Sequence, residues 1–235
     1  MSRVFRSGAK QNYKAAYQRA YAQLGFPLRA RDASSERQIR RAERKLGIEL
    51  PRTLRDFYLV AGREKILRTA FQNIRGPDEL AIERGKLVFV DENQGAVVWG
   101  LDLNTPASKD PTVFQGAIID DEVHRWYREC DRCSTFLIFM LHLQAAYGGA
   151  MSVTASAQVA ANFRALLKNW NFAGAVNGMY AFSRPNQAVC VAEWHDPGQK
   201  RKTWRAFAGA HSREALCQLA AELKLQSLCF PKPAF

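Results

Sequence analysis

The sequence lacks the short motifs that mark the common nucleotide-binding and hydrolytic enzymes. It contains no Walker-type phosphate loop and no Gly-x-Gly-x-x-Gly fingerprint, so the two usual ways of cradling a nucleotide phosphate are missing. A Gly-x-Ser-x-Gly nucleophile elbow is missing as well. Its four histidines never occur as His-Glu-x-x-His or paired with cysteines at zinc-ligand spacing. The missing motifs therefore point to no catalytic residues, no cofactor and no metal.

Long hydrophobic runs and an even set of cysteines are also missing. The longest apolar run, residues 136–141, is far shorter than the roughly 18 residues that span a bilayer. Five cysteines without an apolar leader indicate free thiols in a reducing compartment. Cys130 and Cys133 form a lone CxxC, which we interpret as structural, because zinc needs a second ligand pair and charged residues precede the motif where a redox site has a buried strand. We expect a cytoplasmic protein with no membrane contact.

Acidic residues are scarce relative to basic ones. The 235 residues include 34 Lys and Arg against 22 Asp and Glu, which gives a formal net charge of +12. Residues 1–60 carry +9 and residues 150–235 carry +6, whereas residues 61–149 carry −3. An excess of this kind bears on the sign of a binding partner rather than on the fold.

Part of the excess lies on a short predicted helix. Ser35 and Gln38 form a capping box, and Gly47 supplies the helix stop. Basic residues fall on the face opposite the apolar stripe, so they are expected to form a solvent-exposed ridge. We call this set the basic ridge: Arg37, Arg40, Arg41 and Arg44. A second basic cluster, residues 200–202, is predicted in a turn. Both would suit phosphates, but no nucleic-acid-binding module is recognisable.

Hydrophobic periodicity predicts helices that alternate with hairpins. Helices are expected at residues 12–24 (with a stripe of tyrosines that docks on the protein body), 35–47, 51–62, 126–148, 157–170 and 212–223. Strands are expected at residues 87–90, 96–101, 112–115, 180–182, 188–191 and 203–208. Gly148-Gly149 is expected to end the fourth helix, and His142 within it is expected to be a core residue. The pattern predicts an α+β fold with a mostly antiparallel sheet flanked by helices.

Carboxylates gather at two places without indicating catalysis. Asp91 and Glu92 lie on the loop of the predicted hairpin at residues 87–101, where solvation accounts for them. Residues 120–122 are three consecutive acids, which we interpret as the acidic start of the helix that follows, because negative charge favours a helix N-terminus.

The order of the predicted helices and strands resembles that of the SUKH superfamily, the SMI/KNR cell-wall regulator-like family. The resemblance is carried by Lys45-Leu-Gly-Ile-Glu-Leu-Pro51, by Leu54-Arg-Asp-Phe-Tyr58, and by a hairpin at residues 87–102 around an Asp/Asn-x-x-Gly turn. It covers residues 35–149, about half of the chain. It implies a binding fold without catalytic residues, whose bacterial members look like immunity proteins of polymorphic toxin systems and whose fungal relatives act as regulatory scaffolds.

The resulting hypothesis is a non-enzymatic, immunity-type protein that neutralises a cognate toxin by occlusion. Because complementary charge steers association, the basic chain favours an acidic partner or a toxin that is not a nuclease. The alternative is a basic nucleic-acid-associated protein or a regulatory scaffold. We expect a basic helix and linker at residues 1–34, a SUKH-like core at 35–149, and a hairpin-helix extension at 150–235 that could belong to the same domain. The candidate partner-binding residues are Arg37, Arg40, Arg41, Arg44, Asp91, Glu92 and Trp99.

Overall fold

The structure is a computed structural model that describes residues 12–103, 109–147, 150–151, 153–160, 162–194 and 203–229. This part of the chain contains seven α-helices and two sheets in which every strand pairing is antiparallel, so the predicted α+β class is confirmed. The prediction of one sheet was incomplete, because the strands after residue 150 form a sheet of their own. The predicted helix stop at Gly148-Gly149 and the basic turn at residues 200–202 lie outside the described residues.

The first sheet comes from the middle of the chain. Its strands run in the order β1-β3-β4-β5-β6, with β2 paired to β3. The predicted hairpin is confirmed as β3 and β4, and the third predicted strand as β5. The strands are β1 (Asn73–Ile74), β2 (Ala81–Glu83), β3 (Lys86–Asp91), β4 (Val97–Asp102), β5 (Val113–Ile119) and β6 (Glu122–Cys130).

The second sheet comes from the last third of the chain and has the order β12-β7-β11-β10-β9-β8. The predicted strands at 180–182, 188–191 and 203–208 are confirmed as β9, β10 and β11, each longer than expected. The strands are β7 (Val153–Val159), β8 (Asn171–Val176), β9 (Met179–Arg184), β10 (Gln187–Trp194), β11 (Thr203–Ala210) and β12 (Gln226–Cys229).

Helices lie beside and between the two sheets. Their predicted caps are found where expected: the Ser35 side chain accepts from the Gln38 N–H, and Gly47 ends the second helix in the left-handed region at φ 70°. The helices are α1 (Tyr13–Gln23), α2 (Glu36–Leu46), α3 (Arg52–Ala61), α4 (Ile66–Thr69), α5 (Cys133–Ala146), α6 (Phe163–Leu166) and α7 (Arg213–Glu222), with 3-10 turns η1 (Ala30–Asp32) and η2 (Pro77–Glu79).

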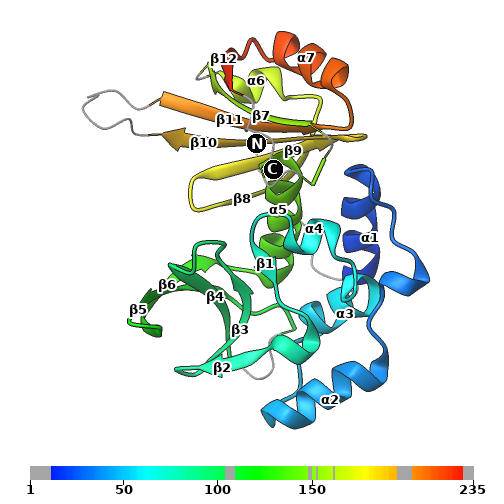
Figure 1. The fold of residues 1–235 in the computed structure, drawn as a ribbon, viewed down its shortest axis with the longest axis vertical. Helices are drawn as coiled ribbons and strands as arrows, with labels where there is room; N and C mark the ends of the chain where they lie inside the picture. The colour runs from blue at the N-terminus through cyan, green and yellow to red at the C-terminus, as the bar shows by residue number, and fades with distance from the viewer. Residues whose placement is uncertain are drawn as a thin grey trace, which may run out of the picture.

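Helix α5 is the centre of the fold and lies between the two sheets (Figure 1). Twelve of its 14 residues are buried, as expected for a helix that is apolar on all sides. Phe136 packs on Phe89 of β3, while His142 on the same helix contacts Ser183 of β9. One hydrophobic cluster therefore joins both sheets, and it extends across the predicted boundary between residues 149 and 150.

Helix α1 lies against α3 and α5, which confirms the predicted docking of its tyrosine stripe. The Tyr17 hydroxyl lies 2.7 Å from Thr53 Oγ1, and the Tyr21 hydroxyl donates to Glu64 at 3.1 Å. Both rings are fully buried. Glu64 in turn accepts from the backbone N–H groups of Ile66 and Leu67, so α1 is tied directly to the start of α4.

The prediction of a helix from residue 126 was wrong, because residues 122–130 form β6. Glycines of the neighbouring strands make room for the indole ring of Trp126 on β6. A Cβ at Gly100 or Gly116 would lie within 2.8 Å of this ring. Asp120 and Asp121, expected at a helix start, form the hairpin turn before β6 with φ values of 52° and 64°.

The predicted helix at residues 157–170 was also wrong. Residues 153–159 pair along their whole length with β11, from Val153 opposite Ala210 to Val159 opposite Trp204. Of the described residues in the predicted range, only the four of α6 are helical, and β8 and β12 were not predicted. Pairing with a distant strand overrode the local helical pattern.

Candidate functional site

The basic ridge is exposed on α2, as predicted. Arg41 pairs with Asp78 of η2 at 2.7 Å. Arg37, Arg40 and Arg44 are exposed and make no ion pair with any residue that the structure describes. Three of the four ridge arginines are thus available to a partner.

The two acidic residues of α2 contact α3 and not the ridge arginines. Glu36 and Glu43 both pair with Arg55 of α3, Glu43 at 3.7 Å. Glu43 also accepts from the Leu50 N–H, which fixes the turn between the two helices. The hydrogen bond from Arg55 lowers the pKa of Glu36. Because both carboxylates are engaged on the α3 side, the ridge is not neutralised by its own helix.

A polar cleft of about 450 Å³ lies next to the ridge. It is bounded by η1, by the turn between α3 and α4, and by η2. Its basic lining residues are Arg31, Arg63, Lys65 and Arg68, and its acidic ones are Asp32, Asp78 and Glu79. A second recess, of about 390 Å³, is lined by Arg37, Arg41 and Arg63 and shares Arg63 and Gln38 with the first. Ridge and cleft therefore form one continuous basic surface.

Two buried groups in the cleft have no hydrogen-bond partner among the described residues. Arg68 is 8% exposed; its Nε donates to the Glu64 carbonyl at 3.1 Å, but its Nη1 makes no hydrogen bond and lies 3.9 Å from Glu79 Oε2. Ser34 is 3% exposed, and its hydroxyl is also unpaired. An unsatisfied buried polar group costs about 1–3 kcal/mol, which an acceptor from outside can recover.

Glycines let the backbone pack closely against these two groups. A Cβ at Gly62 would collide with Ser34 Oγ, and a Cβ at Gly76 would lie 2.9 Å from Arg68 Nη1. The backbone of the cleft wall is fixed by two hydrogen bonds, from the Ser34 N–H to the Tyr58 carbonyl and from the Arg63 N–H to the Asp32 carbonyl.

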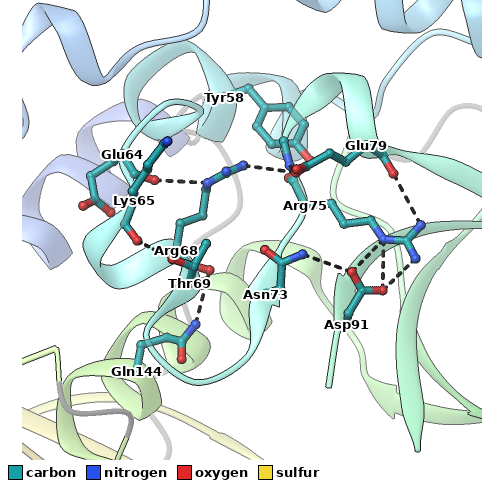
Figure 2. Close-up of polar contacts among 11 residues, drawn as sticks. Tyr58, Glu64, Lys65, Arg68, Thr69, Asn73, Arg75, Glu79, Asp91 and Gln144 are labelled. Atoms are coloured by element: carbon teal, nitrogen blue, oxygen red, sulfur yellow. Dashed lines mark hydrogen bonds and ion pairs between the residues drawn. The ribbon is translucent and has the colours of Figure 1, made fainter. Parts of the chain in front are cut away.

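Gln144 of α5 holds the chain that carries Arg68 (Figure 2). Its side-chain oxygen accepts from the backbone N–H groups of Phe71 and Gln72 at 2.8 and 2.9 Å. Its amide nitrogen donates to the carbonyls of Arg68, at 3.3 Å, and Gln72. The position of the cleft is therefore coupled to the core helix.

Asp91 and Glu92, two of the predicted partner-binding residues, have internal contacts. Asp91 accepts from Arg75 at 2.6–3.0 Å and from Asn73 at 3.1 Å, which clamps the segment before η2 onto β3 (Figure 2). Glu92 accepts from the backbone N–H groups of Gln94 and Ala96 within its own turn. Neither residue lines the cleft.

Trp99 also lies away from the basic surface. It is 6% exposed, faces α5, and has an indole N–H without a hydrogen bond among the described residues. The structure thus places Arg37 and Arg41 in the recess beside the cleft and leaves Asp91, Glu92 and Trp99 elsewhere. Sequence reasoning missed Ser34, Arg63, Lys65 and Arg68. The one available signal was the presence of three basic residues within six positions after the helix stop at Gly62.

The CxxC motif joins β6 to α5. Most residues of β6 are exposed, so the motif does not follow a buried strand, as expected. Burial raises the pKa of the Cys130 thiol and places that of Cys133 well above its usual range. A raised pKa disfavours the thiolate that redox and metal chemistry require. Within the described ranges, no group of three or more His, Cys, Asp or Glu is placed to hold a metal ion.

Comparison with known proteins gives no match to a family model, to a curated protein or to a solved structure. In the part of the chain that the structure describes, no helix has the length and apolarity needed to cross a membrane.

Proposed function

We propose that this protein is a binding module that captures an acidic surface of a partner protein on the basic ridge and the adjoining cleft. It acts by occlusion, as an immunity-type protein does, and not by chemistry. The observation that carries the proposal is the cleft itself. Within the described residues, the buried Arg68 Nη1 and Ser34 hydroxyl make no hydrogen bond, and the ridge beside them carries three arginines without an ion pair.

A carboxylate is the group that this surface suits best. Arginine pairs with carboxylates through charge-assisted hydrogen bonds that are about twice as strong as neutral ones. An Asp or Glu side chain of the partner would reach Arg68 and Ser34 in the cleft, while Arg37, Arg40 and Arg44 would contact acids around it. Such a pattern speeds association and rejects basic partners, because potentials of opposite sign steer the encounter.

The resemblance to the SUKH superfamily supports the class of function. It implies a non-enzymatic binding fold and, for bacterial members, the neutralisation of a cognate toxin. The candidate surface lies on residues 31–79, largely within the region that carries the resemblance.

Co-expression with the product of the neighbouring gene tests the proposal. We expect a stoichiometric complex on size-exclusion chromatography and protection of cells from that product. A variant that reverses the three unpaired ridge arginines (Arg37→Glu, Arg40→Glu, Arg44→Glu) should lose both. If wild-type protein gives neither complex nor protection, the proposal is wrong.

A matched control distinguishes the effect of reversing charges on the ridge from the effect of lowering the net charge of the protein. Arg19 on α1, Lys168 after α6 and Lys224 after α7 are exposed, and reversing them to Glu changes the charge by the same amount. This control variant should retain complex and protection.

The nucleic-acid alternative is favoured instead if a 20-base-pair duplex binds at low salt, the ridge reversal abolishes that binding, and no protein complex forms.

A further inference from the structure

A second cavity, separate from the basic surface, lies between the two sheets. It has a volume of about 350 Å³, within the range of about 300–1,000 Å³ typical of small-molecule sites. Residues of β4 and β6 form one side, α5 lines its length, and β9, β10 and β11 close the other side. It shares no lining residue with the basic cleft.

The walls of this pocket are largely aromatic. The Tyr147 ring packs edge-on against Phe71, with centroids 4.4 Å apart, and against Phe207 at 4.6 Å. Trp194 lies 6.5 Å from Phe207, and Trp99 lines the pocket from β4. Tyr147 is 42% exposed and Trp194 is 38% exposed, so these two rings mark the side that opens to solvent.

Among the described residues that line the pocket, Glu129 of β6 is the one with a charged side chain. It makes no ion pair with any residue in the described ranges. Burial raises the pKa of Glu129, and the neighbouring Trp99 side chain opposes part of that rise. Trp99 Nε1 is buried and makes no hydrogen bond of normal length and angle, although it lies close to this carboxylate.

Gln72, Tyr147 and Asn177 also line the pocket and carry uncharged polar groups. The Gln72 side-chain oxygen accepts from the Asn93 N–H at 2.8 Å. Among the described lining residues, Glu129 is the one group that supplies a negative charge to a bound molecule.

We propose that this pocket binds a small organic cation, an ammonium group on an apolar body, with the ammonium against Glu129 and the aromatic rings. The faces of aromatic rings attract cations, most strongly where water is excluded. The carboxylate adds a charge-assisted hydrogen bond. A ligand carboxylate would meet Glu129 with like charge, and a neutral apolar ligand would desolvate Glu129 without a counter-charge.

Three ligands of equal chain length test the proposal: hexylammonium, 1-hexanol and hexanoate, titrated into the full chain at pH 7.5. Binding is followed by tryptophan fluorescence and by calorimetry. We expect hexylammonium to bind at least about tenfold more tightly than 1-hexanol, and hexanoate to bind most weakly.

Two matched variants test whether the preference for hexylammonium depends on Glu129. Glu129→Gln should remove the preference for hexylammonium over 1-hexanol. Glu122→Gln changes an exposed acid on the same strand and should leave the preference intact. Equal binding of all three ligands, the absence of binding, or a preference that survives in Glu129→Gln would each overturn the proposal. The comparison of head groups uses wild-type protein, so it holds even if one variant does not fold, and it is independent of any protein partner.

Discussion

Replacing Gln144 by leucine should strongly destabilise the protein, although the side chain keeps about the same size. Gln144 is fully buried on α5 and makes four hydrogen bonds to the backbone of residues 68–72. Leucine can make none of them. The surrounding core gives the freed N–H and C=O groups no other partner, and water reaches them poorly because Arg68 and Gln72 are themselves buried.

The magnitude follows from the groups left unpaired. Each buried backbone group that loses its partner costs about 1–3 kcal/mol. The two N–H groups, with bonds of 2.8 and 2.9 Å, should account for most of the cost, whereas the 3.3 Å bond to the Arg68 carbonyl is weak. The gain from burying an apolar side chain offsets part of it. We expect a loss of about 2–5 kcal/mol, a large share of the 5–15 kcal/mol that stabilises a typical domain.

Urea unfolding followed by tryptophan fluorescence at pH 7 measures this loss. The matched control is Gln218→Leu, an exposed glutamine on α7, which should change the free energy of unfolding by less than about 0.5 kcal/mol. A loss below about 1 kcal/mol in Gln144→Leu would refute the reasoning, because the backbone groups must then find other partners.

Three further predictions concern single residues. Burial lowers the pKa of His142 to about 4, so as the pH drops the unfolded chain binds a proton before the folded chain does. The free energy of unfolding should therefore fall by up to about 3 kcal/mol between about pH 6.5 and pH 4. Urea unfolding at pH 7 and pH 4.5 should show a smaller fall for His142→Gln than for the wild type. Gly209→Ala should lower stability by about 1–3 kcal/mol in the same assay, because its Cβ would collide with the Ala145 carbonyl, and an unchanged midpoint would contradict this close approach. Ser34→Ala removes an unpaired buried hydroxyl, so it should leave stability equal or slightly higher while weakening binding of the partner; an equally strong complex would exclude Ser34 from the interface.

The parts of the fold that the sequence predicts well are those with local causes. The capping box at Ser35, the left-handed Gly47 and the β3–β4 hairpin all depend on a few neighbouring residues. The Asn177-Gly178 turn, with φ values of 47° and 79°, is an equally local signal for the β8–β9 hairpin, and it was overlooked. By contrast, β6 depends on glycines of other strands, and β7 on its pairing with β11.

The candidate site likewise has one part that the sequence predicts and another that it does not. Exposure of the ridge on α2 follows from helical periodicity. The burial of Arg68 does not, because it depends on contacts with Glu64, Glu79 and Gln144, which are distributed over 80 residues. The role of Glu129 was hidden by the wrong helix prediction, since on β6 it faces the pocket beside Trp99.

The central claim is that the basic ridge and cleft bind an acidic protein surface. Calorimetric titration of the purified product of the neighbouring gene against three proteins tests it most directly: wild type, the ridge reversal at Arg37, Arg40 and Arg44, and the control reversal at Arg19, Lys168 and Lys224. The account predicts one-to-one binding that the ridge reversal weakens by roughly 100-fold and the control by less than about threefold. Equal losses in both variants, or no binding by wild type, would contradict it.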